Sequence, residues 1–111
     1  MRTDRLDRVT DGGVIAILRG VERDDAVRVA DAVVDAGVTA LEVTADSPDA
    51  TASIKAIADR VDDALVGAGT VLDPETARAA QLAGAEFLVT PTVNAEVVRT
   101  ANRHGTPIAV G

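Results

Sequence analysis

Short apolar runs alternate with longer amphipathic segments along the whole chain. Five runs, rich in Val, Ile, Leu and Ala, have the length of buried strands. They cover residues 13–18, 39–44, 64–68, 86–90 and 107–110. Between them, apolar residues recur with the 3.6-residue period of a helix, as in the segment 24–36. The pattern predicts five strands, a helix in each of the four connections, and a short helix over residues 3–10.

Residues with known preferences for helix ends mark the boundaries of these segments. Ser47, followed by Pro48, is the expected N-cap of the second connecting helix. Asp73 and Asn94 are the expected N-caps of the next two helices. Glycine tolerates the left-handed position after a helix, and three connecting helices are expected to end at Gly37, Gly84 and Gly105.

The short connections, each with a helix, favour a parallel sheet with right-handed crossovers. An internal similarity between residues 36–44 and 83–90 supports a repeating strand–helix unit, since both begin with Ala-Gly and end with Val-Thr. Two α/β architectures fit this alternation. One is an open, doubly wound sheet, and the other is an incomplete (β/α)₈ barrel, because whole barrels need at least ~200 residues.

Composition restricts the chemistry that is available. The 111-residue chain has a net charge of −7 and one aromatic residue, Phe87, which disfavours nucleic-acid binding through a basic or stacking surface. It has no cysteine and one histidine, His104, so thiolate and multi-histidine metal sites are excluded. We expect no metal and no cofactor. The acidic balance, with Lys55 as the sole lysine, fits either a solvated acidic surface or a halophilic-like adaptation to a salty cytoplasm.

The length of 111 residues suits a single domain, 1–111. No apolar run approaches the ~20 residues that span a bilayer, and the N-terminal residues lack the features of a secretory signal. We therefore expect a cytoplasmic protein that does not contact membranes.

Three polar residues occur where successive predicted strands end. Arg19 follows the first strand, Glu42 lies within the second, and Thr70 follows the third after Gly67 and Gly69. The carboxyl ends of parallel strands meet at one edge of a sheet, where ligands bind. A partly desolvated carboxylate has a raised pKa and can exchange protons near neutrality. The alternative for Glu42 is a structural ion pair with Arg19.

Other residues with reactive or ligand-binding groups carry weaker signals. The glycines before Thr70 do not complete the dinucleotide pattern Gly-x-Gly-x-x-Gly, because Leu72 occupies the third position. Lys55 is expected on the solvated face of its helix and is a poor candidate for imine formation. His104 is expected in the last turn of a helix, and we assign it no chemistry.

Four stretches in register resemble the family of 2-keto-3-deoxy-6-phosphogluconate and 4-hydroxy-2-oxoglutarate aldolases and their phosphogalactonate relatives. They are Ile-Ala-Ile-Leu-Arg at 15–19, Leu-Glu-Val-Thr at 41–44, Gly-Ala-Gly-Thr-Val-Leu at 67–72 and Val-Thr-Pro at 89–91. The resemblance implies a (β/α)₈ barrel, usually trimeric. It also implies a class I aldolase that cleaves 2-keto-3-deoxy-6-phosphogluconate-type sugar acids to pyruvate and glyceraldehyde 3-phosphate.

The resemblance also implies roles for individual residues. Glu42 would be the acid/base that moves protons through water. Arg19 and Thr70 would bind the keto-acid end of the substrate, and Pro91 would line the pocket. Some relatives carry an arginine after the second strand. This chain has Ala45-Asp46-Ser47 there, which favours the phosphogalactonate-like branch.

The family's imine-forming lysine lies on a sixth strand, which would come beyond Gly111. We therefore expect the chain to be the N-terminal five strands of such a barrel, inactive as an aldolase alone, since the lysine supplies the electron sink. Two alternatives stay open. One is a non-catalytic half-barrel that associates with a partner, and the other is a small doubly wound domain that binds a phosphorylated ligand.

Overall fold

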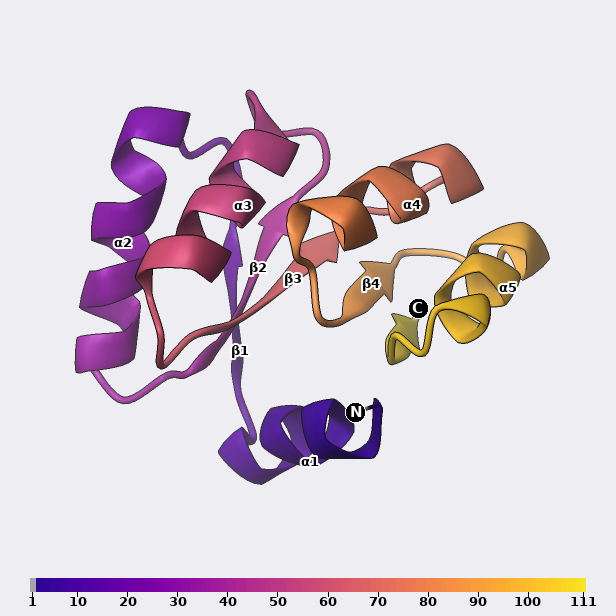
Figure 1. Cartoon of the computed structure of the whole chain (residues 1–111), viewed down its shortest axis with the longest axis horizontal. Coiled ribbons are helices and arrows are strands. Elements are labelled where there is room, and N and C mark those ends of the chain that lie inside the picture. The colour runs from indigo at the N-terminus through magenta and orange to yellow at the C-terminus, as the bar shows by residue number, and fades with distance from the viewer. Residues whose placement is uncertain (1) are drawn as a thin grey trace.

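The computed structural model describes residues 2–111, in which helices and strands alternate (Figure 1). The strands are β1 (Ile15–Leu18), β2 (Ala40–Thr44), β3 (Leu65–Gly69), β4 (Leu88–Thr90) and β5 (Ile108–Val110). The helices are α1 (Arg2–Gly12), α2 (Arg23–Asp35), α3 (Ala50–Arg60), α4 (Pro74–Ala83) and α5 (Ala95–Arg103). Every element expected from the pattern is present. Among the helices of residues 2–111, none combines the length and apolar character needed to cross a bilayer.

The strands form one parallel sheet in the order β1-β2-β3-β4-β5. Each strand pairs with its neighbour in sequence, and β1 lies at an edge. A doubly wound sheet would place the first strand inside the sheet, so that alternative is wrong. Sequential parallel order is the arrangement of strands in a (β/α)₈ barrel, and the fold is a partial barrel of this kind.

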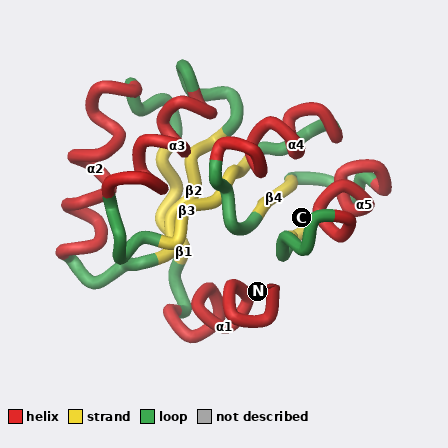
Figure 2. The backbone as a smooth tube through the Cα atoms, viewed as in Figure 1, coloured by secondary structure: helices red, strands yellow, loops and turns green. Residues whose placement is uncertain are grey.

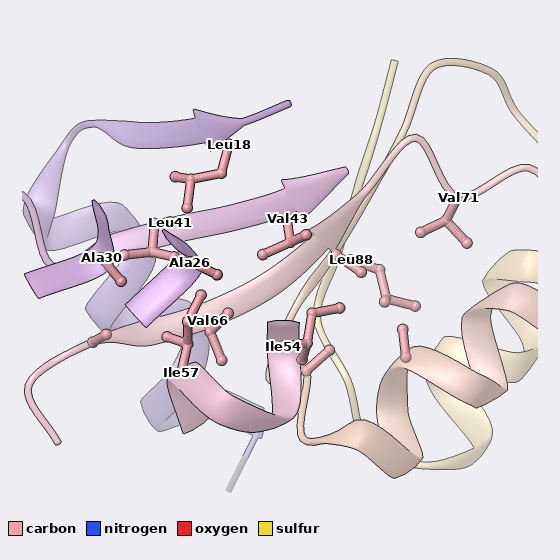
Figure 3. Close-up of a cluster of buried hydrophobic side chains, with 14 of the residues drawn as sticks. Leu18, Ala26, Ala30, Leu41, Val43, Ile54, Ile57, Val66, Val71 and Leu88 are labelled. Carbon is pink, nitrogen blue, oxygen red and sulfur yellow. The ribbon is translucent and has the colours of Figure 1, made fainter. Parts of the chain in front are cut away.

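The helices α2, α3, α4 and α5 cover one face of the sheet (Figure 2). Successive strand residues point to opposite faces, so Leu41 and Val43 lie on the helix side and Glu42 lies on the other. The main core forms between the sheet and these helices (Figure 3). Its largest fully buried side chains include Leu41, Val43, Ile54, Ile57, Val66 and Leu88.

Helix α1 lies beneath the amino ends of the strands (Figure 1). Leu6 and Val9 of α1 face Ile15 and Phe87 across a hollow of about 60 Å³. The Phe87 ring packs against Gly67, where a Cβ would lie 2.7 Å from ring atoms. Apolar side chains therefore fill the amino end of the face that bears Glu42, and polar ones gather at its carboxyl end.

The helix ends follow the expected capping chemistry with one exception. The Asp73 carboxylate accepts a hydrogen bond from the Thr76 amide at 2.6 Å, and Asn94 accepts from the amides of Glu96 and Val97. The predicted cap at Ser47 is wrong. Helix α3 begins at Ala50, because the Ser47 hydroxyl accepts instead from the Gly20 amide and pairs with the Thr44 hydroxyl.

Candidate functional site

Arg19 and Thr70 lie in direct contact at the carboxyl end of the sheet. The Arg19 guanidinium, just after β1, donates from Nη2 to the Thr70 hydroxyl at 3.1 Å. Thr70 immediately follows β3, and Glu42 lies on β2 between them. The strand register places Glu42 opposite Ile17 and Gly67. Three successive strands thus deliver these side chains to the same edge.

The ion partner of Arg19 is Asp46, in the loop after β2. Arg19 Nη1 donates to Asp46 Oδ2 at 2.8 Å, and both side chains are more than half exposed. The alternative of a direct Arg19–Glu42 ion pair is therefore wrong. Hydrogen bonding from Thr44, together with the Arg19 charge, holds the pKa of Asp46 below its usual range. Asp46 was missed as a site residue, although an acid at a strand end on the same edge as Arg19 was a usable signal.

The Glu42 carboxyl group is buried against Gly69. The side chain of Glu42 is only 5% exposed, and a Cβ at position 69 would lie 2.6 Å from its Cδ. Burial raises the pKa of Glu42 above its usual value, and the nearby charge of Arg19 opposes part of that rise. A carboxyl group in this state can take up and release a proton closer to neutrality than an exposed one.

Thr70 has a strained backbone. Its φ is +54°, a left-handed conformation that is unusual for a β-branched residue. Such strain costs on the order of 1–3 kcal/mol and persists where surrounding contacts impose it. Beside Thr70 is a hollow of about 160 Å³ at the end of β2 and β3. It is lined by Ala45, Asp46, Thr70, Leu72, Asp73 and Thr76.

Two hydrogen bonds between loops, and one within the loop after β2, hold the strand ends together. The Gly20 amide donates to the Ser47 hydroxyl at 2.9 Å, which joins the loop after β1 to the loop after β2. The Ser47 hydroxyl pairs with Thr44 at 2.8 Å. The Ala45 amide donates to the Gly69 carbonyl at 2.8 Å and so joins β2 to β3. The loops that carry Arg19, Asp46 and Thr70 are therefore fixed relative to one another.

The remaining candidate residues lie apart from this cluster. Pro91 follows β4, one strand beyond Thr70, and is exposed. Lys55 pairs with Asp59 at 3.3 Å on α3, with 68% of its side chain exposed. His104 is the C-cap residue of α5. Within residues 2–111, no cluster of three potential metal-ligating side chains occurs. A larger hollow, about 540 Å³, lies between α2 and α3 on the outer surface, away from the strand ends.

Comparison with known proteins places this arrangement in context. Residues 6–111 match the family described as "Aldolase: KDPG and KHG aldolase". The chain is 44% identical over 99 residues to 2-dehydro-3-deoxy-6-phosphogalactonate aldolase of Escherichia coli K12, covering 88% of this chain and 48% of that protein. It thus spans about half the length of such curated relatives.

Solved structures agree with the sequence match. The 2-keto-3-deoxy-6-phosphogluconate aldolase of Zymomonas mobilis ZM4, with 3-phosphoglycerate, superposes with a TM-score of 0.86 at 33% identity over 97% of this chain and 51% of that one. The Legionella pneumophila KDPG aldolase, with pyruvate captured as a covalent carbinolamine, gives 0.81 at 30% identity over 87% and 47%. The chain belongs to the KDPG/KHG aldolase family.

Proposed function

We propose that this chain provides the acid/base and carboxylate-binding part of a class I aldolase site. The substrates are 2-keto-3-deoxy-6-phosphogluconate-type sugar acids, and the products are pyruvate and glyceraldehyde 3-phosphate. The names of the relatives and the pyruvate captured in the Legionella enzyme support this substrate class. The observation that carries the proposal is the buried Glu42 carboxyl group, with its raised pKa, beside the Arg19–Thr70 pair.

In the proposed reaction, Glu42 takes a proton from the substrate's C4 hydroxyl through a water molecule as the C3–C4 bond breaks. The electrons of that bond move toward the carbon that bore the keto group, and C3 then receives the proton back from Glu42 through water as pyruvate forms. Arg19 binds the substrate carboxylate, since its guanidinium is a permanently charged donor. The Thr70 hydroxyl positions the keto-acid end, and Pro91 lines the pocket.

The reaction needs an amine to accept the electrons of the breaking bond. Lys55, the only lysine in residues 1–111, is paired with Asp59 on the outer surface and faces away from the site. The proposal therefore requires an amine from outside these residues, on a continuation of the barrel or a separate chain. Residues 1–111 alone are expected to release no pyruvate above background, and they form a single domain in this account.

A chimeric enzyme tests the proposal. Residues 6–111 replace the matching half of the E. coli phosphogalactonate aldolase, and pyruvate release is followed with its own substrate and with 2-keto-3-deoxy-6-phosphogluconate. The chimera should be active, and Glu42→Gln should lower kcat at least about 100-fold, the usual scale for losing an acid/base. The matched change Glu75→Gln, at an exposed acid on α4, should leave kcat unchanged. A Glu42→Gln chimera with full activity contradicts the proposal.

The proposal includes assembly as a homo-oligomer, a trimer as in the family, and a cytoplasmic location. The competing function, a non-catalytic half-barrel that associates with a partner, is favoured by the unpaired edge strands β1 and β5. Ile17 on β1 and Val110 on β5 are also exposed. Light scattering on residues 1–111 tests the half-barrel alternative, because a stable monomer at high concentration is incompatible with it. The loss of chimera activity in Glu42→Gln, described above, is the result that separates the enzyme from that alternative.

A further inference from the structure

The Arg19 guanidinium already has two partners in the absence of ligand. Its Nη1 group donates to Asp46 and its Nη2 group donates to Thr70. A ligand carboxylate that binds Arg19 must therefore share the guanidinium with the Asp46 carboxylate, 2.8 Å from Nη1. The positive charge of Arg19 is balanced by Asp46 before any ligand arrives.

The hollow beside Asp46 has a second acidic residue in its lining. Its lining contains the carboxylates of Asp46 and Asp73 and the hydroxyls of Thr70 and Thr76, and no cationic residue. Asp73 uses one carboxylate oxygen to accept from the Thr76 amide. Carboxylate oxygens accept hydrogen bonds from hydroxyl groups but repel anions. The hollow thus suits a hydroxylated carbon chain better than a second carboxylate.

Resting on the function proposed above, we propose that Asp46 is a specificity-determining residue of this site. It admits keto acids with a single carboxylate and a hydroxylated chain, and it disfavours keto acids with a second carboxylate. Arg19 holds the one carboxylate. The second carboxylate of a dicarboxylic keto acid in the hollow would lie within a few ångströms of Asp46 and Asp73, and the nearby Arg19 would already hold the first carboxylate. Any phosphate on the far end of the ligand must lie beyond the hollow.

The Arg19–Asp46 ion pair is weak enough that a ligand carboxylate can compete with Asp46 for the guanidinium. Both side chains are more than half exposed, and exposed ion pairs are readily shared or displaced. A monocarboxylate therefore still gains access to Arg19. Repulsion between like charges a few ångströms apart in a largely hydrated site corresponds to roughly threefold to tenfold in affinity.

Comparing two keto acids with the same number of carbon atoms distinguishes the effect of ligand charge on affinity from the effect of ligand size. 2-Oxopentanoate carries one carboxylate and 2-oxoglutarate carries two on the same five-carbon chain. Both are titrated into ¹⁵N-labelled residues 1–111 at low ionic strength, where charge interactions are least screened. The wild-type chain should bind 2-oxopentanoate roughly threefold to tenfold more tightly. Asp46→Asn should lower the ratio, with the remainder due to Asp73, whereas Asp59→Asn, which removes the same charge from the outer face of α3, should leave the ratio unchanged.

The outcomes separate this inference from the proposed function. If Arg19→Gln abolishes binding of both keto acids while Asp46→Asn leaves their ratio unchanged, the role of Asp46 is wrong and the proposed function stands. If the wild-type chain binds neither keto acid, the role of Asp46 is overturned, whereas the proposed function is decided by the activity of the chimera. If Asp46→Asn does not fold, as judged from its ¹H–¹⁵N spectrum, Asp46→Ser makes the same comparison.

Discussion

Gly69 lies directly against the carboxyl group of Glu42, two positions after the residue that pairs with Glu42 across the β2–β3 ladder. A Cβ at position 69 would lie 2.6 Å from Glu42 Cδ, far inside van der Waals contact. The absence of a side chain on β3 therefore makes room for a charged side chain on β2. This pairing places a desolvated carboxyl group beside the strand ends that carry Arg19 and Thr70.

Gly69→Ala should destabilise the protein by about 2 kcal/mol. The added methyl group forces the Glu42 side chain or the β3 backbone to move, and overpacking of a tight site typically costs about 1–3 kcal/mol. Denaturant unfolding measures the change. Gly12→Ala, at the end of α1 with open space around its Cβ, should shift stability by less than about 0.5 kcal/mol.

A double-mutant cycle tests whether Glu42 is the group that the methyl group meets. In the Glu42→Ala background, Gly69→Ala should cost clearly less than in the wild type, because the carboxyl group is no longer there to be displaced. Equal costs in both backgrounds would mean that another contact limits position 69.

Ser47→Ala should destabilise the protein by about 1–2 kcal/mol, because it removes the acceptor of the Gly20 amide and leaves the Thr44 hydroxyl with only its long contact to the Leu18 carbonyl. Ser53→Ala is the matched control, since its buried hydroxyl has no hydrogen-bond partner within residues 2–111. That change should be neutral or stabilising. The comparison uses urea unfolding of both variants, and a larger cost at Ser53 would show that the cross-loop hydrogen bonds contribute little.

Thr70→Asn should stabilise the protein by about 1 kcal/mol, because asparagine tolerates the left-handed φ of +54° better than a β-branched residue does. Thermal unfolding measures the change. Thr92→Asn is the control at an exposed position without positive φ. An equal gain at Thr92 would mean that relief of backbone strain is not the cause.

The pH dependence of stability should report the buried Glu42. The pKa of Glu42 is raised in the folded protein above its ordinary value of 4.5, so over a range of pH the folded state retains a proton that the unfolded state has lost. The free energy of unfolding should therefore fall as the pH rises from 4.5 through the folded pKa. The pKa values of Asp46 and Asp73 are lowered, so their opposite contributions change only near and below 3.8.

Glu42→Gln should abolish that fall. The difference in unfolding free energy between Glu42→Gln and wild type should grow in favour of the variant from pH 4.5 toward 7. A difference that stays constant, or that favours the wild type at high pH, would mean that the folded environment stabilises the charged carboxylate.

Much of the fold followed from local patterns. Gly37 and Gly84 have φ values of +103° and +116° just after α2 and α4, as the repeated Ala-Gly predicted. Asp73 caps α4 as the local pattern predicted, and its carboxylate accepts from the Thr76 amide three residues away. Ser47 fits the same rule equally well, yet its hydroxyl accepts from Gly20, 27 positions away in the chain. A contact between loops is invisible to a local capping rule.

Only the shared location of the site residues was predictable from the sequence, because the carboxyl ends of neighbouring parallel strands converge at one edge of the sheet. Arg19, Glu42 and Thr70 were placed at one edge because parallel strands share their direction. The pattern did not reveal that Asp46, rather than Glu42, pairs with Arg19. That choice depends on side-chain reach: Asp46 lies in an exposed loop, whereas the Glu42 carboxyl group is held against Gly69.

The most direct test of this account is a pH titration of the glutamate side chains by ¹³C NMR. The chain has few glutamates to assign, namely Glu22, Glu42, Glu75, Glu86 and Glu96. Glu42 should titrate above 4.5, and Arg19→Gln should move its midpoint higher, because the arginine charge lowers the pKa of Glu42. Arg23→Gln, an exposed arginine on α2 that pairs with Asp24, should leave that midpoint unchanged. A Glu42 midpoint at or below 4.5, or one that Arg19→Gln does not move, would contradict a shared site.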